Sequence, residues 1–413
     1  MRGRLKTIPD NFKLKGKRVL VRVDFNVPLE KVGAKYRVMD TARLEHAIPT
    51  IVRLSRAGAK VILLTHVGAP GGKIITGLRV KPIVEKLKHL LPKDVPRPRS
   101  IYHWRFKQLR PLVENLKEGE IFCLENVRFN KGEETNDLVF AKELSTLADL
   151  YVNEAFSVSH RAHASIVGVC RYLPHYAGWR LAEEIAALDR VSVRPRQPFV
   201  LVLGGAKAHD KTAVMIKLAP RAAVILAAGV IANTLLKIKG VNIGRSKVDD
   251  HPSVGLLKNL MNKRSKIAGL KESVMLIELP IDAIVAESAH GPARIVDLSI
   301  GEQLKPPEVI YDIGPQTMRR FSMFLRRAKT IVWNGPMGLI EQRRFRHGSL
   351  VVGEMIAARS KGKAFGLVGG GETIAVLSET GMAEHVDYIS TGGGAMLEYL
   401  SGQELPGLRP LFK

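Results

Sequence analysis

Short apolar runs rich in Val, Ile and Leu recur along the whole chain, and helix-like segments separate them. Strands of a parallel sheet have this composition, because crossover helices bury them on both faces. We expect strands at residues 19–23, 60–64, 121–124 and 150–152 of the first half, and at residues 199–203, 223–226, 274–277, 309–311, 330–332, 364–368 and 388–389 of the second half. The predicted fold class is therefore α/β, with two doubly wound, Rossmann-like parallel sheets.

The length of 413 residues favours two domains, because a single hydrophobic core stops growing at roughly 250 to 300 residues. Residues 181–191 have the apolar spacing of a helix, and the proline-containing segment 194–198 ends it. We place the connector there, as a hinge helix between a first domain at residues 1–184 and a second at residues 185–390.

No apolar run approaches the roughly 18 residues needed to cross a bilayer, and residues 1–12 lack the apolar centre of a signal peptide. The two cysteines, Cys123 and Cys170, stand outside any metal-ligand spacing and are expected to be buried, inert thiols. These observations predict a soluble, cytoplasmic protein with no membrane partner.

The formal charge of +25 suits a chain that attracts anions, either nucleic acid or small phosphate esters. The most basic stretch, residues 97–110, interleaves arginines with Tyr102, Trp104 and Phe106, as an RNA-stacking surface would. We favour a solvated loop with some rings turned inward. A basic nucleic-acid-binding protein remains an alternative function, which salt-sensitive retention on DNA would favour.

Polar side chains follow the expected strands of the first half, where ligands of open parallel sheets bind. Asp24 and Asn26 are two residues apart, so an extended backbone turns both to one face, where they could hold a hydroxylated ligand. Polar pairs also follow the next three strands: Thr65 with His66, Glu125 with Asn126, and Asn153 with Glu154. This pattern exceeds what polar loops alone predict and indicates a binding site.

Cationic residues stand beside the same strand ends. Arg43 lies in an amphipathic helix expected at residues 39–51 and could reach the site, although a surface salt bridge is an equal alternative. Arg128 and Arg161 follow the third and fourth strands, and His66 precedes a turn through Gly68. Because a guanidinium fork matches a phosphate or a carboxylate, we expect the first half to bind an anion.

Three glycine-rich turns of the second half join a strand to a helix, as phosphate-binding loops do. They are residues 204–211 (Gly-Gly-Ala-Lys-Ala-His-Asp-Lys), 369–373 (Gly-Gly-Gly-Glu-Thr) and 391–395 (Thr-Gly-Gly-Gly-Ala). None of them is a Walker A sequence or a dinucleotide-binding Gly-x-Gly-x-x-Gly. Glu372 adds a carboxylate that could hold magnesium, directly or through water.

Other strand ends of the second half carry Gly229, Asp312 and Asn334. Asn334 belongs to the segment Trp-Asn-Gly-Pro-Met-Gly at residues 333–338, which turn propensity alone does not explain. Together with Glu341, which follows this segment, Asn334 is a candidate nucleotide contact.

In their order and spacing, these segments resemble phosphoglycerate kinase, and the match runs from about residue 19 to residue 402. The hallmarks are Val-Asp-Phe-Asn-Val-Pro (23–28), Glu-Asn-Val-Arg-Phe (125–129), His-Arg-Ala-His-Ala-Ser (160–165), the turn at 204–211, Trp-Asn-Gly-Pro-Met-Gly and the two triple-glycine loops. The resemblance implies an N-terminal domain for 3-phosphoglycerate or 1,3-bisphosphoglycerate, and a C-terminal domain for MgADP or MgATP that closes onto it. It also implies that residues 391–413 pack back on the N-terminal domain, and that the protein is a monomer or a small homo-oligomer.

The resemblance implies a role for each matching residue. Asp24, Phe25 and Asn26 would hold the glycerate hydroxyl region, and His66, Val67, Gly68, Ala69, Arg128 and Arg161 would surround its phosphate. Arg43 would contact the carboxylate and the migrating phosphoryl group, so it and Lys211 are the expected catalytic residues. The nucleotide site would comprise Gly204, Gly205, Lys207, Lys211, Gly229, Asn334, Pro336, Glu341, Gly369, Gly370, Gly371, Glu372 and Thr373, with Glu372 as the Mg²⁺ ligand.

Some positions depart from the family pattern. The family usually has arginine where Ala69 stands, and losing that phosphate contact could cost roughly ten- to a hundredfold in affinity. Glu372 replaces the usual aspartate and keeps its charge on a longer arm, while Glu154 for aspartate and Ser157 for glycine are milder changes. A family member that binds nucleotide without turnover is therefore a second alternative, which separate titrations of 3-phosphoglycerate and MgATP would distinguish.

Overall fold

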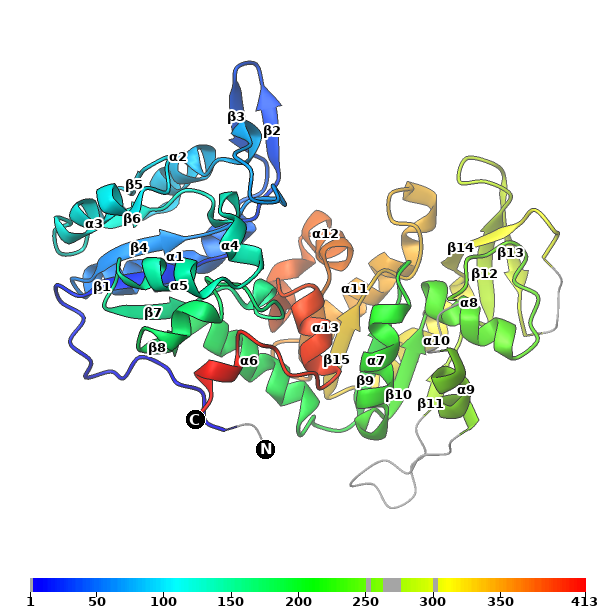
Figure 1. Cartoon of the computed structure of the whole chain (residues 1–413). Helices are drawn as coiled ribbons and strands as arrows, with labels where there is room; N and C mark the ends of the chain where they lie inside the picture. Colours follow the sequence, from blue (N-terminus) through cyan, green and yellow to red (C-terminus); the bar gives the residue numbers. More distant parts are fainter. Residues whose placement is uncertain (1–2, 250–253, 263–275, 300–303) are drawn as a thin grey trace. The chain divides into compact units, whose positions relative to one another are not determined.

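The computed structural model describes residues 3–249, 254–262, 276–299 and 304–413 (Figure 1). The chain divides into two compact units, Met1–Ala186 with Glu404–Lys413, and Ala187–Gln403. Helix α6 (Trp179–Ser192) contains the boundary between them, within the segment in which the connector was predicted.

The first unit is built on a six-stranded parallel sheet with the strand order β5-β6-β4-β1-β7-β8. Its strands are β1 (Arg18–Arg22), β4 (Lys60–Leu64), β5 (Arg99–Ser100), β6 (Ile121–Cys123), β7 (Leu150–Asn153) and β8 (His175–Ala177). In the centre of the sheet, Val21 pairs with Leu63 on one side and Val152 on the other. The four strands predicted in this half are confirmed, whereas the edge strands β5 and β8 are too short to show a recognisable pattern.

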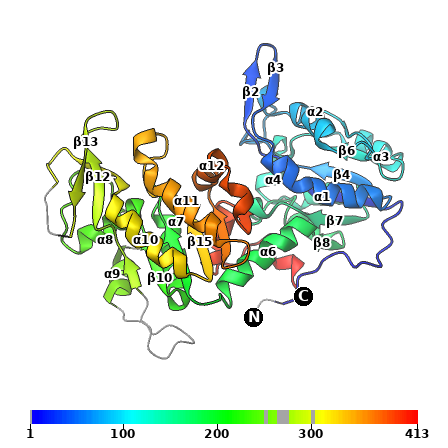
Figure 2. The ribbon, with the colours of Figure 1, turned by 180° about the vertical axis from the view of Figure 1, so that it is seen from behind.

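Side chains of the central strand alternate between two apolar layers, so the sheet is buried on both faces. Val21 belongs to the layer that contains Leu44 of α1 (Ala42–Arg56), and Leu20 belongs to the layer that contains Leu109 of α3 (Phe106–Glu114). The other helices are α2 (Lys81–Leu90), α4 (Lys131–Glu134) and α5 (Leu138–Ser145). Figure 1 shows α5 on one face of the sheet, and Figure 2 shows α1 across the other.

A β-hairpin of β2 (Leu29–Val32) and β3 (Lys35–Val38) projects from the loop between β1 and α1 (Figure 2). None of its residues is fully buried. The sequence analysis did not predict this hairpin, because each strand has only four residues and neither contains an apolar run.

The basic stretch at residues 97–110 turns two of its rings inward, as in the interpretation we favoured. The ring centroid of Trp104 lies 6.0 Å from that of Phe106 and 5.9 Å from that of Phe140. Its Nε1 donates a hydrogen bond to the carbonyl oxygen of Asn126 at 3.1 Å. Trp104 and Phe106 therefore belong to the apolar layer of α3, whereas Tyr102 stays exposed.

The second unit contains a parallel sheet with the strand order β11-β10-β9-β15-β16-β17. Its strands are β9 (Phe199–Leu203), β10 (Val224–Ala227), β11 (Leu276–Glu278), β15 (Thr330–Asn334), β16 (Phe365–Gly369) and β17 (Tyr388–Ser390). The helices are α7 (His209–Leu218), α8 (Gly229–Ile238), α9 (Val254–Asn262), α10 (Pro315–Arg327), α11 (His347–Arg359), α12 (Gly371–Glu379) and α13 (Gly394–Leu400). The predicted strands are confirmed at all six positions, although residues 274 and 275 of the run 274–277 lie outside the described residues.

A separate antiparallel sheet of the second unit has the order β13-β12-β14 and consists of β12 (Asp282–Ala286), β13 (Ala293–Asp297) and β14 (Val309–Ile313). The predicted strand at residues 309–311 is β14, but its assignment to a parallel sheet was wrong, because it pairs antiparallel with β12. A short apolar run shows that a strand is partly buried and does not reveal the direction of its partner.

The chain returns to the first unit at its C-terminal end. The backbone N–H of Lys6 donates to the carbonyl oxygen of Leu411 at 2.7 Å, and Nδ2 of Asn153 donates to the carbonyl oxygen of Gly407 at 3.3 Å. We expected the returning segment to begin at residue 391, but residues 391–403 belong to the second unit. The reason is that α13 packs against α7 and buries Met396.

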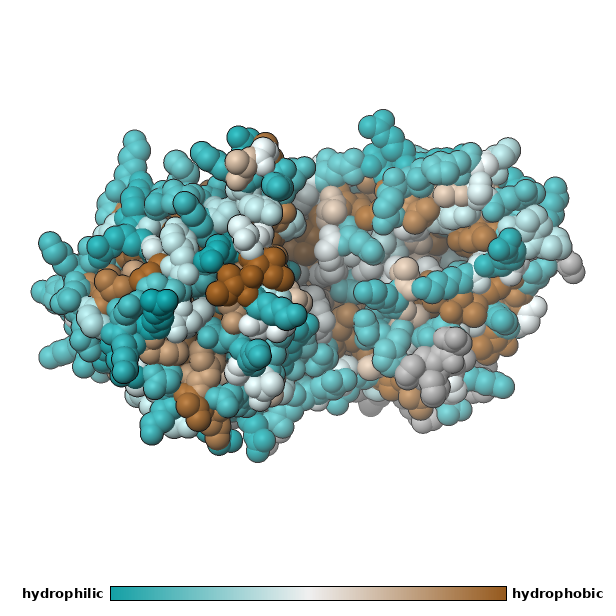
Figure 3. All heavy atoms as spheres, turned by 45° about the horizontal axis from the view of Figure 1, so that its top comes forward, coloured by the Kyte–Doolittle hydropathy of each residue, from teal (hydrophilic) through white to brown (hydrophobic). Residues whose placement is uncertain are grey.

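Hydrophilic side chains predominate on the face that Figure 3 shows, with apolar groups between them. Exposed apolar side chains of the first unit include Val32, Met39, Ile74 and Ile75, in or near the β2–β3 hairpin and the loop before α2. In the described part of the chain, no helix combines the length and apolarity needed to cross a membrane.

Candidate active site

Two neighbouring strands define the centre of the candidate site in the first unit. After β1 the chain continues into β4 on one side of it, and it later enters β7 on the other side. β1 and β7 therefore flank the point where the strand order reverses, which is where open parallel sheets bind ligands. Asp24 follows β1, and its Oδ2 accepts a hydrogen bond from Nη1 of Arg43 at 2.7 Å. The hydroxyl of Ser157, from the loop after β7, also donates to Oδ2. The structure thus places Arg43 beside Asp24, in an ion pair with it.

The loop after β4 contacts the loop after β1. The backbone N–H of Gly68 donates to Oδ1 of Asn26 at 2.8 Å, and Gly68 has φ +61°, a conformation that favours glycine. Phe25 and Val67 are buried and hold these loops in the core. Ala69, in contrast, is exposed and offers no polar side-chain atom.

Arg128 is buried beside this loop. It lies in the 3₁₀ turn after β6, where Oδ1 of Asn126 accepts the backbone N–H of Arg128 at 3.1 Å. Its Nη1 donates to the carbonyl oxygen of Gly68 at 2.7 Å, and its Nε lies 3.2 Å from Oε1 of Glu134. Its Nη2 is buried without a hydrogen-bond partner among the described residues. A buried guanidinium N–H without a partner suits an anionic ligand.

The pKa of His66 reflects its burial and the positive charges of the surrounding arginines. The imidazole is almost fully buried, and burial together with the charges of Arg22, Arg128, Arg43 and Arg161 holds its pKa well below the usual range. Arg161 itself is exposed and donates from Nε to Nε2 of His160 at 3.2 Å. Four arginines from different parts of the chain therefore converge on the carboxyl ends of these strands.

The candidate site of the second unit lies at the switch point between β9 and β15, which are adjacent in its sheet. The loops after these strands approach so closely that a Cβ atom on Gly204 would lie 2.0 Å from the carbonyl oxygen of Pro336. The backbone N–H of Gly205 donates to that oxygen at 2.7 Å. Gly229, after β10, has φ +58°, and a Cβ atom there would lie 2.6 Å from the carbonyl oxygen of Gly205. The glycines thus let three strand ends meet.

Lys211 places an ammonium group among these glycines. A Cβ atom on Gly205 would lie 3.5 Å from its Nζ, which donates to the carbonyl oxygen of Lys207 at 3.1 Å. Burial lowers the pKa of Lys211, and the nearby carboxylates of Glu372 and Asp210 partly offset this shift. The side chain of Lys207 is exposed.

The loop after β16 completes the glycine cluster. The hydroxyl oxygen of Thr373 accepts the backbone N–H of Gly335 at 2.8 Å, and Gly370 has φ +99°. Gly371 and Glu372 are exposed at the start of α12. Asn334 is buried and donates from Nδ2 to the carbonyl oxygen of Gly369 at 3.0 Å, so its side chain links β15 to β16. The third glycine loop precedes α13 and does not line the cavity described next.

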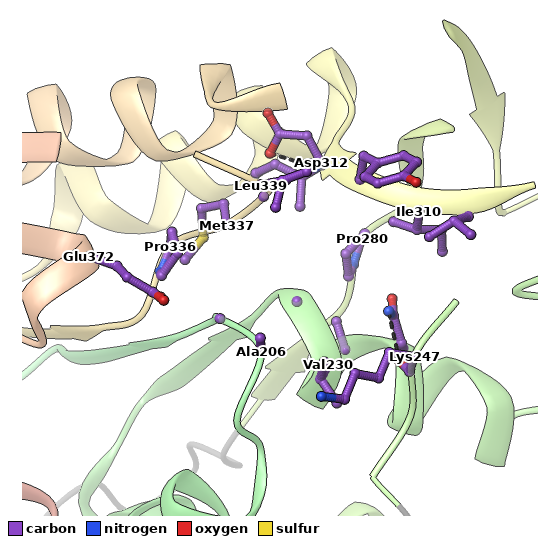
Figure 4. A pocket seen from close by; sticks show the side chains of 18 of the residues that line it. Ala206, Val230, Lys247, Pro280, Ile310, Asp312, Pro336, Met337, Leu339 and Glu372 are labelled. Carbon is purple, nitrogen blue, oxygen red and sulfur yellow. Dashed lines mark hydrogen bonds between the residues drawn. The ribbon is translucent and has the colours of Figure 1, made fainter. Parts of the chain in front are cut away.

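A cavity of about 230 Å³ extends from the glycine cluster toward the antiparallel sheet. Of the predicted nucleotide residues, Gly205, Gly229, Pro336, Glu341 and Glu372 line it. Figure 4 shows Glu372 and Pro336 toward one end, and Lys247, Pro280 and Ile310 toward the other. The sequence analysis gave these last three residues no role, because Lys247 and Pro280 lie in loops without a motif and Ile310 lies within the predicted strand at residues 309–311.

Asp312 also lines the cavity and is buried. Burial raises the pKa of its carboxyl to about 7, although the backbone N–H groups of Gly348, Ile313 and His347 favour the ionised form. Two of these hydrogen bonds, from Gly348 and Ile313, measure 2.9 Å each. The position of Asp312 after an apolar run was the only sequence signal for this part of the cavity.

The residues present fit a magnesium ion that arrives with a nucleotide. Among the described residues, no three His, Cys, Asp or Glu side chains gather as a self-sufficient metal site. Mg²⁺ usually takes one or two carboxylates together with substrate phosphates and water. Glu372, exposed beside the glycine cluster and near Lys211, could supply such a carboxylate.

Comparisons with known proteins agree on one family. The family model described as phosphoglycerate kinase matches residues 9–403. A protein named phosphoglycerate kinase from Thermomicrobium roseum is 42% identical over 413 residues, which cover 99% of this chain and 100% of the relative. One from Moorella thermoacetica is 41% identical over 400 residues, 96% of this chain and 97% of the relative. The solved structure of phosphoglycerate kinase from Coxiella burnetii superimposes with a TM-score of 0.83 at 32% identity and covers 99% of each chain.

Proposed function

The chain belongs to the phosphoglycerate kinase family, and we propose that its first unit binds 3-phosphoglycerate or 1,3-bisphosphoglycerate while its second unit binds MgADP or MgATP. The family reaction is the reversible transfer of a phosphoryl group between 1,3-bisphosphoglycerate and ADP in glycolysis, so the chain is a phosphotransferase. The observation that carries the proposed division of substrates is the convergence of four arginines on His66 in one unit and of three glycine-lined strand ends on Lys211 in the other.

In the first unit, the phosphate of the three-carbon acid would lie against His66, Arg128 and Arg161. The unpartnered Nη2 of Arg128 supports this placement, because a phosphate oxygen would satisfy it. Asp24 and Asn26 would orient the glycerate hydroxyl from their shared face of the loop after β1. Gly68 and Ala69 would contact the ligand through backbone atoms alone.

Arg43 and Lys211 would stabilise the migrating phosphoryl group. Arg43 is tied to Asp24 through Nη1 and about a third of its side chain is exposed, so further guanidinium N–H groups can reach a ligand. The buried ammonium of Lys211 keeps its positive charge close to Gly205, where phosphate oxygens would lie. In-line phosphoryl transfer needs such positioning and charge stabilisation and no covalent enzyme intermediate.

Magnesium, when bound, would neutralise charge on the nucleotide phosphates, with Glu372 as its protein ligand. Because the two substrates would bind on separate units, we propose that the units close during each turnover, with flexion in or near α6. We place the enzyme in the cytoplasm, as a monomer or a small homo-oligomer.

A coupled assay of 1,3-bisphosphoglycerate and ADP conversion tests the proposal together with the Lys211→Ala variant. We expect kcat to fall by about a hundredfold or more. The matched control is Lys217→Ala, at an exposed lysine of the same helix, which should leave kcat unchanged. Separate calorimetric titrations should show that 3-phosphoglycerate and MgATP each bind, and binding of MgATP alone would contradict the proposed function of the first unit.

A further inference from the structure

A fully buried arginine, Arg22, contacts His66 in the proposed phosphate site. Arg22 is the last residue of β1, and its side chain has 0% exposure, so it cannot act as a solvated surface charge. Its Nη2 lies 3.2 Å from Nδ1 of His66. A guanidinium group carries only N–H donors, so the nitrogen that faces it must be the acceptor of this hydrogen bond.

The position of Arg22 is fixed from the other side by a buried chain of hydrogen bonds. Its Nε donates to the hydroxyl oxygen of Ser165 at 3.0 Å, and that hydroxyl donates to Oε1 of Glu133 at 2.6 Å. Glu133 has 0% exposure and also accepts the backbone N–H of Ser165 at 2.9 Å. The carboxylate of Glu133 balances the charge of Arg22, and Nδ1 of His163 lies 3.6 Å from Oε1 of Glu133. A proton on His66 would add an uncompensated positive charge beside Arg22.

We propose that Arg22 is a positioning residue that fixes His66 in the tautomer with a bare Nδ1 and a protonated Nε2, so that Nε2–H donates a hydrogen bond to the phosphate of the three-carbon acid. This inference rests on the proposed function of the first unit. His66 is not free to present either nitrogen. A shift of its proton to Nδ1 would place two N–H groups against each other, and a half-turn of the ring would replace the acceptor by a C–H group. Among the described residues, none accepts a hydrogen bond from Nε2, which leaves it for a ligand.

The surroundings keep His66 neutral. Burial acts first, and the charged groups that face the ring, Arg22, Arg128, Arg43 and Arg161, act in the same direction, so its pKa is low. The imidazole therefore recognises phosphate as a neutral donor, while the arginines supply the charge. The hydrogen bond from His66 to the phosphate should not weaken as the pH rises through the range in which an ordinary histidine loses its proton.

Long-range ¹H–¹⁵N NMR of the wild-type protein tests the tautomer directly, with His66→Gln to assign the signals. The spectrum should show a protonated Nε2 and an unprotonated Nδ1, unchanged between about pH 5.5 and 8. A protonated Nδ1 at any of these pH values would overturn the proposal. This measurement requires no change to the buried network and no ligand.

Kinetics of the Arg22→Lys variant test the effect on binding, because lysine keeps the charge but cannot hold Ser165 and His66 at once. We expect the KM for 3-phosphoglycerate to rise about tenfold or more, with kcat within about twofold of the wild type. The matched control is Arg18→Lys on the same strand, where the arginine forms a half-buried pair with Asp149 away from His66. Thermal unfolding of both variants checks that they are folded.

A double-mutant cycle separates this inference from the proposed function. In the His66→Gln background, Arg22→Lys should change the KM by less than about twofold, because its effect passes through His66. An equal rise in both backgrounds would overturn the positioning role. If His66→Gln alone left the KM unchanged, the placement of the phosphate against His66 would be wrong, while the NMR result would still decide which nitrogen of His66 carries the proton.

Discussion

Arg43 donates a hydrogen bond from Nη1 to Oδ2 of Asp24 across 2.7 Å and thereby ties the first turn of α1 to the loop after β1. Asp24 is itself held, because the hydroxyl of Ser157 donates to the same oxygen and the backbone N–H of Asn26 donates to Oδ1 at 3.1 Å. An exposed arginine loses side-chain entropy when it binds a ligand, and this fixed partner removes part of that cost in advance.

Replacing Arg43 by alanine is expected to lower kcat by about a hundredfold, because a charged donor to the migrating phosphoryl group is lost. Steady-state kinetics in both reaction directions measure this effect. Arg56→Ala is the control, since Arg56 lies at the other end of the same helix in an exposed pair with Asp94. An unchanged kcat for Arg43→Ala would refute its catalytic role.

Restoring an arginine at Ala69 should strengthen the binding of 3-phosphoglycerate. Ala69 is exposed and follows Gly68, whose carbonyl oxygen accepts the hydrogen bond from Arg128. An exposed ionic contact is worth up to about 1 kcal/mol, so we expect Ala69→Arg to lower the KM by about fivefold. Ala69→Gln controls for side-chain length without charge. If the KM does not fall, another cation already makes the contact that this position lacks.

Gly204→Ala should damage the nucleotide site and the fold around it. The added Cβ atom would lie 2.0 Å from the carbonyl oxygen of Pro336, a backbone atom that cannot move without the loop after β15. We expect the free energy of unfolding to fall by about 2 kcal/mol and the affinity for MgADP to fall with it. Chemical denaturation and calorimetry measure the two effects. In contrast, Gly255→Ala in α9 meets no atom within 4 Å and should preserve both properties.

Much of the fold could be predicted because the central strands are buried on both faces, and such strands appear in a sequence as uninterrupted apolar runs. Strand β4 spans residues 60–64, as expected. The β2–β3 hairpin could not be predicted, because its side chains are exposed or half-buried. The direction of β14 depends on its pairing with β12, a contact between distant segments that local composition does not encode.

The site was predictable where polar residues follow a strand directly. Asp24, His66 and Arg128 became candidates in this way, and the structure brings their loops into contact through Gly68. Lys247 was missed because no motif surrounds it. Arg22 received no role, although a charged residue within the apolar run 19–23 was itself a signal, since arginine is rarely fully buried without a partner.

Glu154 links the pH dependence of stability to the start of the connecting helix. Its Oε1 accepts the backbone N–H of Leu181 in α6 at 2.7 Å, and the side chain is buried. Burial raises the pKa of Glu154 from its ordinary value of 4.5 to about 7, although Thr50 and two backbone N–H groups partly offset this shift. Between about pH 4.5 and 7, the carboxyl of Glu154 therefore carries a proton in the folded chain but not in the unfolded chain. The stability from this proton is full below pH 4.5 and is lost as the pH rises through about 7.

Glu154→Gln should therefore stabilise the protein, and more so at higher pH. Glutamine keeps an oxygen for the N–H of Leu181 and removes the buried charge, so we expect a free energy of unfolding about 1 to 3 kcal/mol above wild type at about pH 8. At about pH 5 the gain should be less than about 1 kcal/mol. Urea denaturation at the two pH values measures the difference, with Glu183→Gln in the exposed pair of α6 as a control that should change little. A Gln variant that is less stable than wild type at pH 8 would mean that the ionised carboxylate stabilises the helix start by more than its burial costs.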